Sequence, residues 1–211
     1  MASSIIHLAI TEKVTEGLKI KDLNRLRLGS VLPDGAVHVN GHMKIRICDG
    51  TRSTYDLEAF RRIFGERMKE DDLYLGYYLH LVQDLIFRRF VYTVYNWDPL
   101  PPGNVERLYR DYTITNAYVI QKYGLEKTML QPISLSGEPI LELGPFDVEE
   151  LVGRIQNQFQ PVEDTGIFFF TRKMADEFIE MAVAPCLEEL KALADGKPGL
   201  GSAEWSWVRH S

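Results

Sequence analysis

An almost continuously apolar stretch over residues 75–92 is the clearest feature in the pattern of hydrophobic and polar positions. A helix that is apolar all round is typically covered by neighbours on every side, so this pattern predicts a buried central helix. His80 and Asp84 interrupt the stretch four positions apart, which places them one turn apart on one helix face. An ionised carboxylate is almost never fully buried without a partner. Asp84 therefore needs compensation from His80, from a residue such as Arg88, or from a metal ion.

Apolar residues recur at helical spacing in several further segments, some of which begin with an acidic residue that suits a helix start. Pro33 and the neighbouring glycines predict a loop over residues 20–36, and residues 125–146 read as irregular. The pattern therefore predicts about six helices packed as one bundle. Their approximate ranges are 4–19, 56–69, 70–95, 104–123, 147–159 and 171–193.

Alternating apolar residues over 36–47, with Asn40-Gly41 between them, predict a small β-hairpin. A three-residue loop of Asn40, Gly41 and His42 keeps the apolar residues of both strands on one face, whereas a two-residue loop separates them. We therefore expect His42 in the turn, where a side chain can be presented to a ligand. The fold class expected from the whole pattern is mainly α, a single-domain helical bundle with one small β-hairpin.

Composition narrows the class of protein. The chain has 211 residues, of which 45% are apolar and 26% charged, and this composition and length suit one globular domain. A net charge of −6 argues against nucleic acid as a stable partner and against a membrane surface. Cys48 and Cys186 form neither a metal-spacing motif nor a disulfide framework. With no charged leader and no run of ~20 apolar residues, we expect a cytoplasmic protein.

The motifs of several enzyme classes are missing from the sequence. It contains no Gly-x-Ser-x-Gly elbow, no Walker loop, no dinucleotide-type glycine motif and no His-Asp dipeptide. What remains is a sparse set of histidines and aspartates, of types that bind zinc in groups of three or four. His80 and Asp84, one helical turn apart, can bind the same metal ion, but the same pair can also form a simple buried hydrogen bond. The residues by themselves leave these two alternatives open.

The segment Leu75-Gly76-Tyr77-Tyr78-Leu79-His80-Leu81-Val82-Gln83-Asp84 resembles the central ligand helix of the zinc-dependent phospholipase C family, which shares its helical fold with S1/P1-type nucleases. Residues 4–10, with His7, resemble the first ligand helix of that family. Residues 29–34 resemble the loop that brings in an aspartate, here Asp34, and residues 41–43 resemble the segment that supplies the next histidine. The order His, Asp, His, then His-x-x-x-Asp is kept over residues 4–92. Tyr109-Arg110-Asp111-Tyr112 is similar to a segment of small bacterial relatives of this family.

This resemblance implies a metal site within residues 1–124, with residues 125–211 as the C-terminal helices and tail of the same domain. One zinc ion would be held by Asp34, His42, His80 and Asp84, and a second by His7, with Asp84 bridging the two. The family has a further histidine six residues after the aspartate, where this chain has Phe90, and no H-x-x-x-E follows. One or two ions, of zinc or another divalent metal, are therefore expected, and the remaining site of the family is missing.

The function expected from the resemblance is metal-dependent hydrolysis of a phosphate ester or phosphodiester by a metal-activated water, with a small phosphorylated substrate. Asp34 or Asp111 would orient or deprotonate that water. The alternative is a non-catalytic protein of the same fold, in which His80 and Asp84 form a structural pair or a structural metal site. A further alternative is a partner-binding module that uses the irregular region 125–170.

Overall fold

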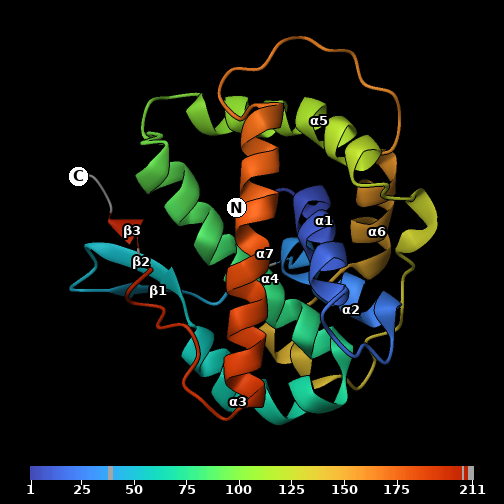
Figure 1. Ribbon diagram of the computed structural model, residues 1–211, viewed down its shortest axis with the longest axis vertical. Coiled ribbons are helices and arrows are strands. Elements are labelled where there is room, and N and C mark those ends of the chain that lie inside the picture. The colour runs from blue at the N-terminus through green and yellow to red at the C-terminus, as the bar shows by residue number, and fades with distance from the viewer. Residues whose placement is uncertain (38–39, 206, 209–211) are drawn as a thin grey trace.

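The computed structural model describes residues 1–37, 40–205 and 207–208, and most of these residues lie in helices. The mainly α class is confirmed, and each of the six expected helices is present (Figure 1). The expected loop over residues 20–36 was wrong in part, because α2 and the short 3₁₀-helix η1 (Leu32–Gly35) form there. The main helices are α1 (Ser4–Thr15), α2 (Leu23–Gly29), α3 (Leu57–Glu70), α4 (Asp72–Arg89), α5 (Asn104–Lys122), α6 (Val148–Asn157) and α7 (Arg172–Ala194).

Short polar side chains begin the helices by binding backbone N–H groups that no turn of helix can satisfy. Asp56 accepts from the N–H of Ala59 at the start of α3, and Asp147 accepts from that of Glu150 at the start of α6. Asp22 caps α2 in the same way. An aspartate at this position is a helix-start signal, but the glycines and Pro33 that follow it favoured a loop in the sequence analysis. The chain leaves α4 through a π-helical turn, η2 (Phe90–Val94), and two 3₁₀-helices, η3 (Lys127–Met129) and η4 (Pro139–Leu143), lie in the irregular region.

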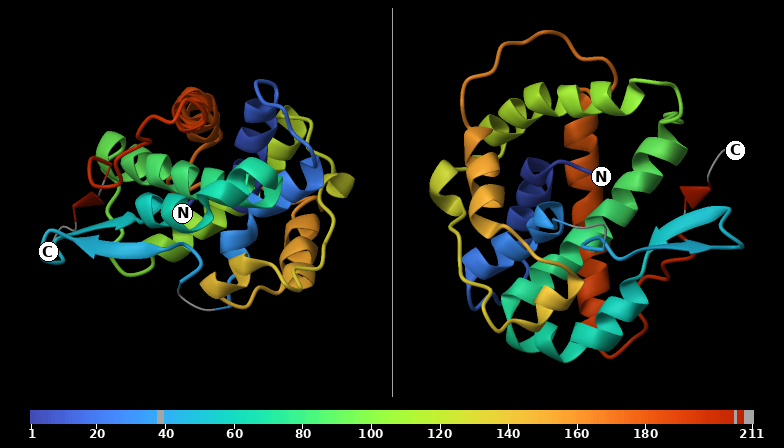
Figure 2. Two further views of the ribbon diagram at one scale, coloured as in Figure 1. Left: turned by 90° about the horizontal axis from the view of Figure 1, so that it is seen from below. Right: turned by 180° about the vertical axis from the view of Figure 1, so that it is seen from behind.

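Helix α4 runs through the middle of the molecule, as its apolar surface predicts. Every residue from 76 to 87 is buried. Helices α1, α2, α3 and α7 pack against it, and α7 crosses its face in Figure 1 while the view from behind shows α1 and α2 beside it (Figure 2). One hydrophobic core contains residues of both halves of the chain, including Phe170 and Phe178 beside Phe87.

The closest helix crossing joins α2 to α4 through two glycines. A Cβ on Gly76 would lie 2.1 Å from the carbonyl oxygen of Leu26, and a Cβ on Gly29 would lie 2.1 Å from that of Leu73. Neither distance is tolerable for a real side chain, so only glycine at both positions lets the two backbones touch. This contact fixes Ser30, and the aspartate loop that follows it, against α4.

The β-hairpin lies later in the chain than the sequence pattern predicts. β1 (Lys44–Ile47) pairs antiparallel with β2 (Arg52–Tyr55), and the two-residue strand β3 (Trp207–Val208) adds to the β2 edge. The expected hairpin over residues 36–47 was wrong in its first strand, because the N–H of Val37 bonds to the carbonyl of Pro145 and not to the strand that begins at Lys44. His38 and Val39 lie outside the described residues. His42 does lie in a turn, which is closed by the N–H of Met43 on the carbonyl of Asn40.

Within the described residues, none of the helices combines the length and the apolar character that crossing a bilayer requires.

Candidate metal centre

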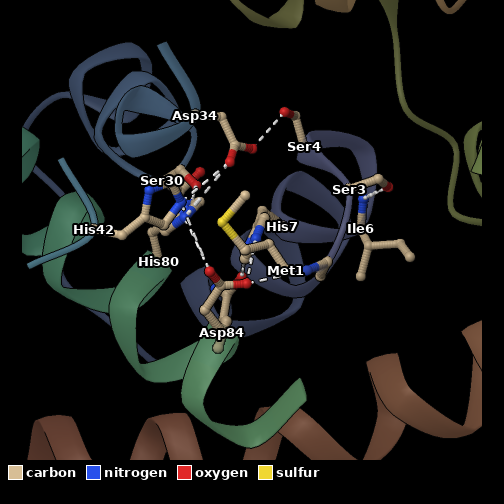
Figure 3. A network of polar contacts seen from close by, with 12 residues as sticks. Met1, Ser3, Ser4, Ile6, His7, Ser30, Asp34, His42, His80 and Asp84 are labelled. Carbon is tan, nitrogen blue, oxygen red and sulfur yellow. Dashed lines mark hydrogen bonds and ion pairs between the residues drawn. The ribbon is translucent and has the colours of Figure 1, made fainter. Parts of the chain in front are cut away.

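The structure brings together all five residues that the sequence analysis predicts as metal ligands (Figure 3). They come from four segments: α1 supplies His7, η1 supplies Asp34, the turn before β1 supplies His42, and α4 supplies both His80 and Asp84. The side chains of His7, His80 and Asp84 are fully buried, while those of Asp34 and His42 keep 14% and 12% of their surface. The cluster is therefore an enclosed polar site with one partly open side.

The imidazole orientations are fixed by hydrogen bonds on the far side of each buried ring. His80 donates from Nδ1 to the carbonyl of Ser30 at 2.8 Å, so its Nε2 carries the lone pair when the ring is neutral. His7 lies with Nδ1 2.7 Å from Oε1 of Gln83, whose amide nitrogen in turn donates to Thr11. Both Nε2 atoms are thereby aimed into the cluster, an arrangement typical of metal-binding histidines.

Four buried atoms in the cluster have no hydrogen-bond partner among the described residues. They are Nε2 of His7, His42 and His80, and Oδ2 of Asp84. An unsatisfied buried polar atom is costly, and four of them converging on one place indicate a missing common partner. Because a neutral Nε2 and a carboxylate oxygen both offer lone pairs, one shared cation would satisfy all four atoms.

Four distances between donor atoms approach those of a tetrahedral ion. Oδ1 of Asp34 lies 3.4 Å from Nε2 of His42 and 3.9 Å from that of His80, and Oδ2 of Asp84 lies 3.7 Å from each of these nitrogens. In a tetrahedral zinc site with bonds of about 2.0–2.1 Å, donor atoms lie roughly 3.3 Å apart. The donor atoms form two overlapping groups, in each of which they lie within 4.8 Å of one another: His7, His80 and Asp84, and Asp34, His42 and His80.

His7 faces the other oxygen of the same carboxylate. Its Nε2 lies 3.4 Å from Oδ1 of Asp84, which also accepts the N–H of Ala2 at 3.0 Å. The rings of His7 and His80 stack with centroids 3.9 Å apart. Asp84 therefore presents one oxygen to His7 and the other to His42 and His80, which is the arrangement of a bridging carboxylate. The four-donor position is better supplied with protein ligands than the position beside His7.

The protonation states also suit metal ligation. Burial, together with the charge of His7, lowers the pKa of His80 to about 3, so this ring is neutral. Burial raises the pKa of the Asp84 carboxyl, but the close approach of His7 and the surrounding positive charge outweigh it and hold that pKa well below its ordinary value. Burial alone would lower the pKa of His7, yet Asp84 raises it overall. A proton on His7 thus supplies positive charge that a metal ion can replace.

Asp34 connects the cluster to the molecular surface. Its Oδ1 faces the histidines, while its Oδ2 accepts a hydrogen bond of 2.7 Å from the hydroxyl of Ser4. The residue also lines a cleft of about 610 Å³ between the N-terminal segment, α5 and α6. A ligand in this cleft can therefore reach the open side of the cluster.

The residues that orient the ligands were missed by the sequence analysis. Gln83 carried a usable signal, since it is a third polar residue within the apolar stretch and is itself fully buried. Ser30 acts through its backbone carbonyl, which no side-chain pattern reveals. Phe90 lies in the core against the rings of Tyr95 and Phe178. The family has a further histidine at this position, whereas in this chain the side chain packs in the hydrophobic core.

Asp111 does not join the five converging residues in the described part of the chain. Its carboxylate accepts the N–H groups of Phe168, Phe169 and Phe170 at 2.7–2.8 Å. Both oxygens are thus committed to holding the segment before α7 on α5. The structure gives Asp111 this anchoring role, and its use as a catalytic base stays a prediction.

Replacing Asp111 by asparagine should lower the free energy of unfolding by about 2 kcal/mol, because the amide nitrogen cannot accept from the backbone N–H groups. Urea denaturation would measure this loss. Asp49→Asn is the matched control, because Asp49 is exposed in the hairpin turn. Equal urea midpoints for Asp111→Asn and the wild type would contradict the anchoring role.

Comparison with models of protein families, with curated proteins and with solved structures found no match to this chain. The likeness to the zinc-dependent phospholipase C family therefore stays a proposal that rests on the ordered ligand residues.

Proposed function

We propose that this protein binds a divalent metal ion, zinc in the first place, and uses it to hydrolyse a small phosphate ester or phosphodiester. The observation that carries the proposal is the convergence of three unpartnered histidine nitrogens and two carboxylates from four segments. Asp34, His42, His80 and Asp84 would hold the first ion, and His7 with Asp84 would hold a second. Zinc bound in such a site lowers the pKa of water towards ~7 and offsets charge on phosphoryl oxygens.

The protein groups around the site have separate tasks in this proposal. Among the described residues, Asp34 is the one carboxylate that both faces the histidines and lines the cleft. Its Oδ2 would accept the proton of the attacking water, and the hydroxyl of Ser4 holds that oxygen in place. The fully buried His7, His80 and Asp84 keep bulk water away from the inner side of the cluster. A substrate would approach from the cleft alone.

Metal analysis combined with a hydrolysis assay tests this function. The purified protein is expected to contain about one equivalent of zinc, or two if the position beside His7 fills, and to hydrolyse bis(4-nitrophenyl) phosphate. A chelator should abolish the hydrolysis, and added zinc should restore it. Because binding a metal only in the folded state adds to stability, the chelated protein should also melt at a lower temperature. Folded protein that takes up no metal, measured on samples reloaded with zinc, would contradict the proposal.

A second candidate function is a structural metal site without catalysis. It is favoured by the completeness of the four-donor position, since structural zinc sites use four protein ligands while catalytic sites keep an open one. The same assay separates the two candidates. Stoichiometric metal and a chelator-sensitive melting temperature without any hydrolysis would support the structural site. Hydrolysis that follows the metal content would support the catalytic one.

A further inference from the structure

Among the described residues, Arg154 of α6 supplies the only basic side chain of the cleft beside the metal centre, and the geometry points to this residue as the anchor for the phosphoryl group of the substrate. This inference rests on the proposed function and names a substrate-binding residue. It draws on the C-terminal half of the chain, to which the sequence resemblance assigns no role.

Close packing of α6 on η1 places Arg154 beside the metal centre. A Cβ on Gly35 would lie 2.8 Å from Cδ2 of Leu151, so the two elements approach as closely as a glycine allows. One turn away from that contact, Nη2 of Arg154 donates to the backbone carbonyl of Asp34 at 3.1 Å. The guanidinium is thus held at the wall of the cleft, next to a predicted metal ligand.

The rest of the guanidinium remains available to a ligand. Glu150 lies one turn earlier on α6, but its carboxylate is 3.9 Å from Nε of Arg154 and both side chains are largely exposed, so the pair is weak. A guanidinium offers five N–H donors in a planar fork that matches two oxygens of a phosphoryl group. With one donor bound to Asp34, the fork still has donors for a phosphoryl group between Arg154 and the cluster.

Arg154 is the only basic side chain among the described residues that line the cleft. The α-amino group of Met1 lies in the same cleft, but it is buried near Asp84 and Asp34. Asp34 and Asp84 together cancel the charge of one divalent ion, so the loaded four-donor position attracts a phosphate only weakly over distance. The partly exposed guanidinium of Arg154 is therefore the group best placed to attract a phosphoryl group into this cleft.

The cleft has room for the ester group of such a substrate. Its volume of about 610 Å³ lies in the usual range for small-molecule sites. Tyr109 offers a half-exposed ring on one wall. The floor is a polar chain in which Ser3 donates to Asn116, and Asn116 donates to the side-chain carbonyl of Gln158. An ester group with an aromatic ring could stack on Tyr109, and its polar atoms could bond to the chain of Ser3, Asn116 and Gln158.

The test compares Arg154→Gln with the wild type, both loaded with zinc. Arg154→Gln should lower kcat/KM for bis(4-nitrophenyl) phosphate about tenfold, mainly through KM, because one charged hydrogen-bonding group is lost. Arg154→Lys, which keeps the charge but not the planar fork, should recover part of the loss. Arg62→Gln, the same change at an exposed arginine of α3, is the control and should leave both constants unchanged. Zinc content should be equal in all variants.

A calorimetric titration with inorganic phosphate separates the failure of this inference from the failure of the proposed function. The zinc-loaded wild type should bind phosphate about tenfold more tightly than Arg154→Gln. If no substrate is hydrolysed but this difference appears, the hydrolase proposal fails and the anion site stands. If the diester is hydrolysed with the same KM by both proteins, or if phosphate binding is equal or absent in both, the assignment of Arg154 is overturned.

Discussion

Replacing Asp84 with asparagine should reduce the zinc content of the purified protein from about one equivalent to nearly none. Asp84 supplies an oxygen 3.7 Å from both His42 and His80, and the other oxygen faces His7 at 3.4 Å. Asparagine keeps the shape but removes the charge and puts an NH₂ group where one lone pair has to be. Loss of even a residue that only orients a ligand costs about 10–100-fold in metal affinity, so loss of this shared ligand should cost at least as much.

The stability of the metal-free form of the same variant gives a second readout. Without a metal ion, the buried carboxylate of Asp84 faces His7 at 3.4 Å, and each residue shifts the pKa of the other towards its charged form. The uncharged amide leaves buried His7 without that partner, so metal-free Asp84→Asn should melt at a lower temperature than the metal-free wild type. The exposed Asp49→Asn serves as control and should keep its zinc. Wild-type zinc content in Asp84→Asn would contradict the metal centre.

Gly76→Ala is expected to be the most damaging small substitution in the fold. The added methyl group would lie 2.1 Å from the carbonyl oxygen of Leu26 and 2.9 Å from the backbone nitrogen of Ser30. Since the obstacle is backbone and not a flexible side chain, α2 has to move away from α4. Overpacking usually costs about 1–3 kcal/mol, and a clash with backbone belongs at or above the top of that range. Chemical denaturation would measure the lost free energy of unfolding.

Zinc binding should weaken in the same variant although no ligand has been changed. The carbonyl of Ser30 orients His80 through its 2.8 Å contact with Nδ1, and Asp34 follows four residues later in η1. Gly65→Ala is the matched control, because a Cβ at Gly65 of α3 meets nothing within 4 Å. It should stabilise the protein by up to about 1 kcal/mol through helix propensity. A Gly76→Ala protein as stable as the wild type would contradict the close crossing.

The two substitutions separate the chemistry of the site from its support. Asp84→Asn removes a metal ligand without moving a helix. Gly76→Ala keeps every ligand but shifts the segment after α2, which orients His80 through Ser30 and carries Asp34. If Gly76→Ala lowers zinc affinity although every donor is still present, then the helix crossing determines the ligand geometry. That result would also explain why a glycine lies in the middle of a helix, where it otherwise costs stability.

The central helix was predictable from the sequence because one physical rule decides it. A helix buried on every side must be apolar on every side, and residues 75–92 satisfy this rule with few exceptions. Those exceptions, His80 and Asp84, were recognisable for the same reason, since a buried carboxylate demands a partner. The β-hairpin was misplaced because short alternating patterns are weak. The backbone of Val37 found a partner in Pro145, more than a hundred residues away.

Taken alone, the sequence determined the fold class, the positions of six helices and the presence of His80 and Asp84 on one face of the central helix. These depend on periodicity and on the burial of charge, which are local properties of the chain, whereas the family resemblance alone implied His7, Asp34 and His42 as ligands. Only the tertiary structure decided that His7, Asp34 and His42 meet His80 and Asp84. It also decided that Ser30 and Gln83 orient two of the histidines, and that Arg154 stands beside the opening. These features follow from contacts between distant segments, and the glycine-to-backbone crossing of α2 and α4 is the contact that positions Ser30 and Asp34.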